Sequence, residues 1–273
     1  MLVLTKKHII NLYVWVDDAL PKPSLAKAGR LSCLTNNELI TILIWNTLTV
    51  KQRNLKDIYY WINLEYQSEF PHLPCYENFV KHCHRTLPLM IKVLNDLIQS
   101  TSTIRIMDST MLQVCKLVRA DSHKTALNIA DFGKNHQGWH YGFKLHASIN
   151  LQKQLCGLAL TPASHNDAQQ MPKILNKYAR VAVGDGGYTA SVMRKHIFEI
   201  YGTIIVSPPH FKQNKKLITP WQYTLLRIRP KIESVFDYLK EHLNLVSSFP
   251  RSVAGYLLHY VRILLGYQIM VIS

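Results

Sequence analysis

Two short stretches, TIRIMDST at residues 103–110 and RVAVGDGGY at residues 180–188, decide the fold class of this chain. Each is an apolar run with β-branched residues that leads to an aspartate, Asp108 in the first and Asp185 in the second. Such runs predict buried strands, and functional groups of open α/β sheets gather at strand ends. We therefore predict that both aspartates close strands and lie close together if the strands are neighbours. A capped turn at Asp108 and an ordinary loop at Asp185 are the alternatives.

Further strands and helices surround these two strands in the sequence. Alternating or apolar runs predict strands at residues 111–118, 140–150, 154–163 and 203–208. Helical patterns cover residues 165–179 and 189–202, and the chain from Thr219 onward is predicted to be helical with a break at Pro230. This order of elements predicts an α/β domain with a mixed sheet flanked by helices.

Residues 1–100 are predicted to be helical. The segment LTNNELITILIWNTL has a capping box from Thr35 to Glu38 ahead of apolar residues at helical spacing. Basic residues lie between this helix and the next: Lys51, Arg53 and Lys56. We therefore predict a helical DNA-binding region at residues 1–100 and a second domain at residues 101–273. A plain helical bundle fits the first region equally well.

The composition favours a nucleic-acid partner. The chain has 273 residues, with 32 Lys and Arg against 17 Asp and Glu, and a formal net charge of +15. A charge excess of this size attracts polyanions. Five widely spaced cysteines and an N-terminus that does not resemble a secretory signal predict free thiols and a cytoplasmic location. The most apolar stretch carries His259 and Arg262 at mid-span, so we predict a buried helix there and no membrane partner.

A third acidic residue, Glu233, lies in RPKIESVFDYLKEHL at residues 229–243. Five apolar side chains form one face of this predicted helix: Ile232, Val235, Phe236, Leu239 and Leu243. Glu233 and Lys240 share an adjoining face. Three acids at two strand ends and on a late helix can hold two divalent cations that act on a phosphodiester. Oxygen ligands favour Mg²⁺ or Mn²⁺. An exposed helix carboxylate is the alternative for Glu233.

With these residues in place, the chain resembles the DDE transposases of bacterial insertion sequences. Asp108 in IRIMDST, Asp185 in VAVGDGGY and Glu233 in RPKIESVFDYLK correspond to the acidic triad of that family. The resemblance covers roughly residues 100–270 and is looser in the N-terminal helices. It implies that the α/β domain at residues 101–273 has an RNase H-like fold and is catalytic, with the triad as its metal ligands.

The late helix is similar to the Tyr-Arg-Glu-Lys signature of these transposases. Arg229, Glu233 and Lys240 have its spacing, and Leu226 stands at the position of the tyrosine. The resemblance implies that Lys240 and Arg229 contact DNA phosphates. It also implies that two Mg²⁺ or Mn²⁺ ions activate a water that cleaves double-stranded DNA at the terminal inverted repeats. The freed 3′-hydroxyl then attacks target DNA, with the protein bound to the DNA as a homodimer.

Further candidate DNA contacts lie in the basic and aromatic run GKNHQGWHYGFKLH, residues 133–146. Strand alternation places Lys144 and His146 on one face, from which both would reach the DNA backbone. An ordinary packed sheet face is the alternative. Two other functions fit the same residues: a metal-dependent nuclease or resolvase that cuts without strand transfer, and a non-catalytic basic DNA-binding protein.

Overall fold

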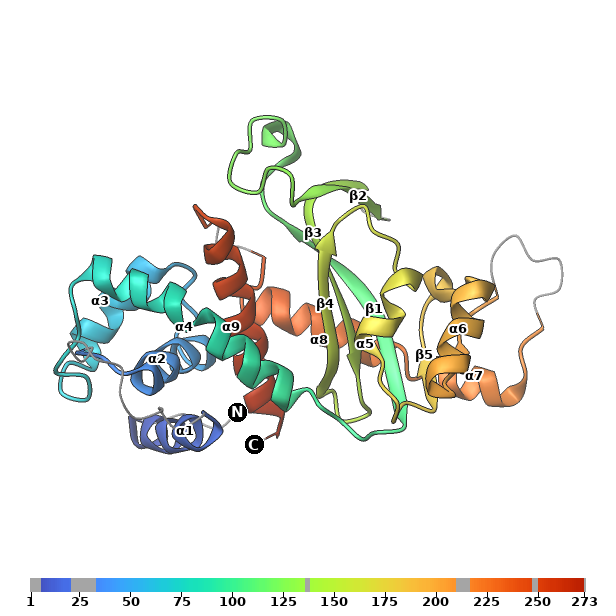
Figure 1. Cartoon of the computed structure of the whole chain (residues 1–273), viewed down its shortest axis with the longest axis horizontal. Coiled ribbons are helices and arrows are strands. Elements are labelled where there is room, and N and C mark those ends of the chain that lie inside the picture. Colours follow the sequence, from blue (N-terminus) through green and yellow to red (C-terminus); the bar gives the residue numbers. More distant parts are fainter. Residues whose placement is uncertain (1–5, 21–32, 136–137, 210–216, 247–249, 273) are drawn as a thin grey trace. The chain divides into compact units, whose positions relative to one another are not determined.

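The computed structural model describes residues 6–20, 33–135, 138–209, 217–246 and 250–272, and the chain packs as two compact units (Figure 1). The helical unit comprises Met1–Asp96 and Leu243–Val271, and the sheet unit comprises Leu97–His242. Residues 101–273 are therefore not one compact body. The C-terminal helix α9 (Val253–Ile272) packs within the helical unit instead.

The sheet unit contains a six-stranded sheet in the order β2–β3–β1–β5–β6, with β4 also paired to β3. The strands are β1 (Ile104–Gln113), β2 (Asp131–Asn135), β3 (Gly138–Ile149), β4 (Leu155–Pro162), β5 (Val181–Val183) and β6 (Ile204–Val206). β1 is antiparallel to β3 and parallel to β5, and β5 is parallel to β6. The predicted α/β class with a mixed sheet is confirmed, and this strand order is consistent with an RNase H-like domain.

Four helices pack against this sheet: α5 (Met171–Ile174) on β4, α6 (Ser191–Tyr201) and α7 (Pro220–Leu226) on β6, and α8 (Pro230–Asp237) on β1. Gly202 ends α6 in the left-handed conformation, at φ 67°, as a glycine at this position can. The predicted break at Pro230 is confirmed, because α7 ends at Leu226 and Pro230 occupies the first turn of α8. The apolar face predicted for the late helix is buried.

The structure corrects two predictions about strands. β1 is one continuous strand, and Asp108 lies inside it rather than at its end. The reason is β3, which pairs with β1 from Ile106 to Gln113 and so supplies hydrogen-bond partners well past Asp108. The short polar strand β2 was not predicted, because its sequence DFGKN has neither the alternation nor the β-branched residues of a strand.

The helix predicted at residues 165–179 is also corrected. Only a 3₁₀ turn, Ala168–Gln170, and the single turn of α5 form there. Two asparagine side chains compete with the helix for backbone groups: Asn166 accepts from the Ala168 N–H at 2.9 Å, and Asn176 accepts from the Tyr178 N–H at 3.1 Å.

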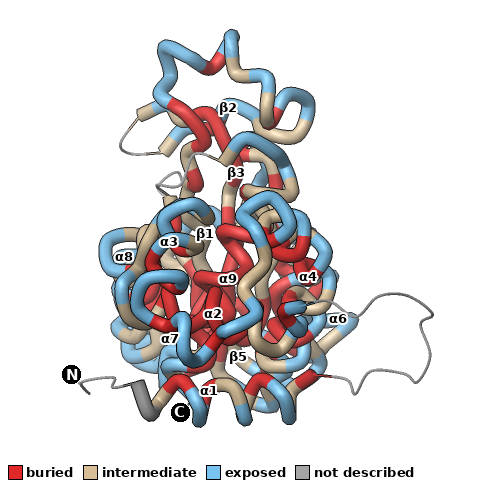
Figure 2. The backbone as a smooth tube through the Cα atoms, turned by 90° about the vertical axis from the view of Figure 1, so that its left-hand side faces the viewer, coloured by how far each residue is buried: buried red, intermediate tan, exposed pale blue. Residues whose placement is uncertain are grey.

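The helical unit contains α1 (Lys6–Ala19), α2 (Asn36–Leu48), α3 (Leu55–Glu65), α4 (Tyr76–Leu97) and α9. The predicted capping box of α2 is present, with Thr35 and Glu38 each accepting a backbone N–H of the other. Most of α2 and α9 is buried (Figure 2). By length and composition α9 could cross a membrane. Its burial, including that of Arg262, is that of a core helix, as predicted.

A close approach at Gly157 provides a stability test of the sheet unit. A Cβ at this position would lie 2.1 Å from the carbonyl oxygen of Ile174, at the end of α5. Backbone cannot move aside as a side chain can, so we expect Gly157→Ala to lower the free energy of unfolding by about 1–3 kcal/mol. Thermal melting checks this, with Gly186→Ala as the control because a Cβ there meets nothing within 4 Å. Equal melting temperatures for the two variants would contradict the packing of α5 on β4.

Candidate active site

The parallel pairing of β1 and β5 brings Asp108 and Asp185 to one place. Ile106 lies opposite Val183, the last residue of β5. Asp108 lies two residues further along β1, and Asp185 lies two residues beyond the end of β5, so both follow the same paired position, and the Asp185 carboxylate is close enough to raise the pKa of Asp108. The condition set for the two aspartates to lie close together, that their strands are neighbours, is met. Asp185 follows β5 after Gly184, and its Oδ1 accepts a hydrogen bond from the Gly187 N–H at 2.8 Å.

Glu233 joins these acids through Arg229. The Arg229 Nη2 lies 2.8 Å from Glu233 Oε1 and 3.7 Å from Asp108 Oδ2. Pro230 explains the local geometry, because it holds Arg229 at the cap of α8, one turn before Glu233 and on the same side. Arg229 thus lies among the acids in this structure, 31% exposed, where it neutralises part of their charge.

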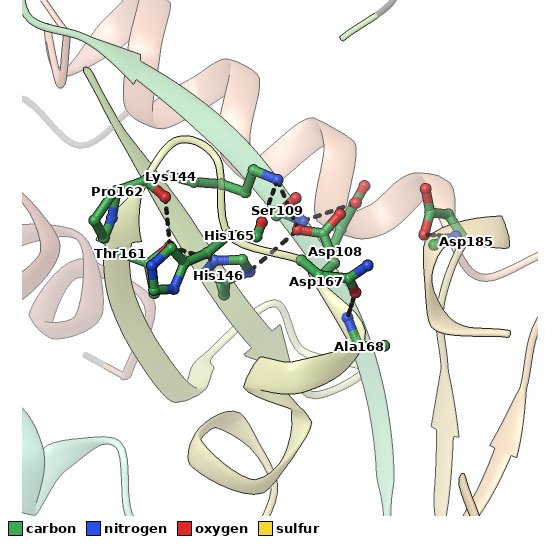
Figure 3. A network of polar contacts seen from close by, with 12 residues as sticks. Asp108, Ser109, Lys144, His146, Thr161, Pro162, His165, Asp167, Ala168 and Asp185 are labelled. Atoms are coloured by element: carbon green, nitrogen blue, oxygen red, sulfur yellow. Dashed lines mark hydrogen bonds and ion pairs between the residues drawn. The ribbon is translucent and has the colours of Figure 1, made fainter. Parts of the chain in front are cut away.

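A fourth carboxylate, Asp167, belongs to the same cluster and was not predicted as a site residue. In Figure 3 it lies beside Asp108 and is reached by Lys144 and His146. Its Oδ1 is 3.2 Å from Lys144 Nζ and 3.4 Å from His146 Nδ1. The sequence signal for Asp167 is its position near the start of the helix predicted at residues 165–179. In the structure its side chain makes no capping hydrogen bond and pairs with Lys144 and His146 instead.

The glycines around Asp185 accommodate side chains of the site. A Cβ on Gly184 would lie 2.6 Å from the ring of Tyr188, and a Cβ on Gly187 would lie 3.3 Å from Asp167 Oδ2 and 3.0 Å from Asp185 Oδ1. Gly187 thus allows the carboxylates of Asp167 and Asp185 to approach each other. Of these three glycines, Gly184 and Gly187 are in close contact with side chains of the site, and Gly186 has open space beside it.

The electrostatics of Asp108 reflect this crowding. The pKa of Asp108 is raised to about 7. Burial is the largest cause, and the carboxylates of Asp185 and Asp167 also raise the pKa, whereas the hydrogen bond from the Ser109 N–H and the charge of Arg229 lower it. The side chain is 14% exposed. An acid that holds its proton near neutral pH between two other acids is typical of a functional site that binds a cation.

The two candidate DNA contacts on β3 differ from the prediction. His146 is completely buried, so its side chain cannot contact DNA in this structure. Its Nε2 lies 2.9 Å from Thr161 Oγ1, and burial lowers the pKa of His146 to about 4, which keeps the ring neutral. Lys144 is 12% exposed and bonds Asp167 and the carbonyl oxygen of His165. Lys144 and His146 do share one face of β3, as predicted, but both side chains contact Asp167.

Lys240 lies in a π-helical turn, Tyr238–His242, that continues α8. The predicted common face of Glu233 and Lys240 assumes α-helical geometry over seven residues. The π-helical turn departs from that geometry before Lys240 is reached. Lys240 is half-buried, and burial lowers its pKa.

The donor set suits a hard divalent cation. Carboxylate oxygens are the ligands that Mg²⁺ and Mn²⁺ prefer, and burial, followed by the neighbouring carboxylates of Asp185 and Asp167, raises the pKa of Asp108. Among the described residues, no three His, Cys, Asp or Glu side chains lie close enough together to form a ready metal cluster. Arg229 stands between two members of the predicted triad in this structure.

Fold and site together define a class: an α/β enzyme domain whose acids meet where β1 and β5 pair, beside a late helix. A family model for the transposase DDE domain matches residues 98–253, which is more than half of the chain. The chain belongs to this family and is a DDE-type transposase, a protein that acts in DNA transposition. The predicted recognition is confirmed at this level.

The pH dependence of stability tests the electrostatics of Asp108. Because its folded pKa is raised, the stabilisation from its bound proton is fully present below about pH 4 and is lost as the pH rises to about 7. Asp108→Asn carries no such loss. We therefore expect the variant to gain stability over the wild type across this range, on the order of 3 kcal/mol, with no further gain at higher pH.

Denaturation midpoints between pH 5 and 8 without divalent metal measure this difference. Glu199→Gln is the matched control, because Glu199 is an exposed carboxylate of the same unit, 57% accessible. If the difference in stability between Asp108→Asn and the wild type stays constant with pH, the folded-state pKa of Asp108 is not raised by burial.

Proposed function

We propose that this transposase cleaves double-stranded DNA at the terminal inverted repeats of its element and joins the freed 3′-hydroxyl ends to target DNA. Asp108, Asp185 and Glu233 would hold two Mg²⁺ or Mn²⁺ ions. The observation that carries the proposal is the bridge formed by Arg229, which links Glu233 to Asp108 beside the end of β5. Asp108 and Glu233 share the Arg229 guanidinium, and Asp185 follows the strand that pairs with β1.

The side chains have distinct parts in this reaction. When bound, the ions supply an activated nucleophile at neutral pH and stabilise the attacking and leaving oxygens of an in-line displacement. Asp108 loses its proton to become a ligand. Asp185 keeps one oxygen on the Gly187 N–H and offers the other. Glu233 separates from Arg229, whose guanidinium then turns to a DNA phosphate with bidentate geometry.

Lys144 and His146 both contact Asp167, the fourth carboxylate of the cluster. His146, neutral and fixed by Thr161, holds the position of Asp167, and Asp167 in turn orients Lys144 toward the catalytic acids. Lys144 is then placed to contact the phosphate backbone near the cleaved bond. Lys240 contacts a second phosphate. The net charge of +15 assists the approach of DNA, and we propose a homodimer on DNA and a cytoplasmic location.

Loss of either Asp185 or Glu233 should abolish the chemistry. We expect Asp185→Asn and Glu233→Gln to reduce Mg²⁺-dependent nicking and joining of labelled element ends at least about 100-fold, because fixed metal charge at the reacting oxygens is lost. DNA binding should be retained or tightened as acidic charge is removed. Glu199→Gln, with the same chemical change on an exposed surface, should keep full activity.

The same assay separates the proposed function from its rivals. Nicking without joining by the wild type would indicate a nuclease or resolvase. Unchanged nicking in both triad variants would exclude these acids from catalysis and favour a DNA-binding role for the chain.

Lys240 provides a test of DNA contact that leaves the acids intact. We expect Lys240→Ala to weaken binding of element ends and to reduce the slope of log K against log salt by about 0.9, the value for one phosphate contact. Binding measured at several salt concentrations checks this. Lys195→Ala is the control, because Lys195 is 79% exposed and lies on α6. Equal slopes for the two variants would count against a phosphate contact at Lys240.

A further inference from the structure

The helical unit contains a cavity of about 840 Å³ that the chemistry above does not use. Every residue that lines it belongs to this unit, from the start of α3, from α4 and from the start of α9. Its charged lining is strongly basic, with Arg53, Lys56, Arg251 and Arg262 against the single carboxylate of Asp57. The volume is that of a site for a small organic group rather than for one ion or water.

The inner wall carries a buried positive charge. Arg262 is 3% exposed, and its guanidinium bonds only neutral groups among the described residues. Two of them are the carbonyl oxygens of Gln52 and Arg53, at 2.8 and 3.1 Å. A third is Nδ1 of His259, whose Nε2 lies 3.0 Å from the carbonyl oxygen of Asn244. No carboxylate among the described residues pairs with Arg262, so its charge is not neutralised within this unit.

The same contacts fix the mouth of the cavity. By holding the carbonyl groups of Gln52 and Arg53, Arg262 ties the start of α3 to α9. The start of α3 thereby lines the cavity, with exposed Arg53 just before the helix and exposed Lys56 in its first turn. Asp57 is engaged locally, since its Oδ2 accepts from the Asn54 amide at 2.6 Å. The positive end of this eleven-residue helix adds to the cationic lining.

Aromatic rings and an unused polar atom complete the lining. Tyr60 and Tyr76 line the cavity and are 52% and 38% exposed, which is unusual for rings of this size. Lys56 Nζ lies 6.0 Å from the centre of the Tyr60 ring. The Nδ1 of His84 is buried without a hydrogen-bond partner among the described residues. Cations beside exposed rings are the groups that bind a phosphate and the base attached to it.

We propose that this cavity binds an unpaired nucleotide of a DNA strand. The phosphate would lie on Arg53, Lys56 and Arg251, and the base would stack on Tyr60 or Tyr76. A concave site of this volume accepts a projecting nucleotide, whereas a regular duplex backbone would contact a flat or convex basic surface. The inference rests on DNA being the substrate of the proposed function, and it adds a second DNA site in the helical unit.

The test compares two triple variants of the full-length chain. Arg53→Gln, Lys56→Gln and Arg251→Gln together remove three exposed cations of the cavity. Lys81→Gln, Arg85→Gln and Lys92→Gln remove three exposed cations of α4 that do not line it. Binding is measured against salt without divalent metal, so its outcome does not depend on cleavage. The DNA is a duplex with a three-nucleotide single-stranded overhang, compared with the blunt duplex.

We expect the wild type to prefer the overhang about tenfold, as one stacked base would give. The cavity variant should lose this preference, and its salt slope for the overhang DNA should fall by about 2 to 3, while the α4 variant keeps the preference. Tyr60→Ala combined with Tyr76→Ala should remove the preference and leave the salt slope nearly unchanged. The single variant Arg53→Lys keeps the positive charge, so an unchanged salt slope in this variant would show that the phosphate contact at residue 53 depends on charge alone.

Two results would overturn the proposal. One is equal binding of overhang and blunt DNA by the wild type, and the other is an identical response of the two triple variants. A third arm adds deoxyadenosine monophosphate to the free protein. Protection from thermal unfolding that the cavity variant loses, without any change in its DNA binding, would mean that the cavity takes a free nucleotide and would also overturn the proposal.

Discussion

The parallel register of β1 and β5 is the constraint on which the candidate active site depends. Ile106 is held opposite Val183, and each of the two aspartates follows this pair by two residues, which sets where their carboxylates can lie. Like charges at such spacing are costly where water is largely excluded. The fold therefore holds a repulsion that a cation can relieve. In this structure part of that relief comes from Arg229, a residue of the chain itself.

The sequence contained most of what determines the sheet, and little of what determines how deeply the side chains of the candidate site are buried. Local signals were sufficient where one residue imposes the outcome, as Gly202 does at the end of α6 and Pro230 at the start of α8. They were insufficient where the partner is distant. The extension of β1 beyond Asp108 depends on pairing with β3, whose partner residues lie 29 (Gln113 to Gly142) to 37 (Ser109 to His146) positions later in the chain, and no pattern within β1 predicts it.

The candidate site shows the same division. The triad acids were predicted from strand and helix patterns together with a family resemblance, because each lies where regular structure positions it. Asp167 was missed because it lies in a segment shaped by side-chain hydrogen bonds, where helical propensity loses to asparagine turns. Alternation on β3 located the shared face of Lys144 and His146. It could not show that His146 is buried, because the side chains that contact its ring, Thr161 and Asp167, come from later in the chain.

The two units resemble each other in one physical respect. Each buries an ionisable group whose charge its own residues do not fully compensate: the carboxyl of Asp108 in the sheet unit, whose pKa burial raises to about 7, and the guanidinium of Arg262 in the helical unit. Such groups lower stability when unpaired, and binding a ligand of opposite charge to the folded state alone recovers that stability. A divalent cation would compensate the first. A phosphate on Arg53, Lys56 and Arg251 would place negative charge in the cavity that Arg262 lines, so under the two proposals substrate binding also stabilises each folded unit.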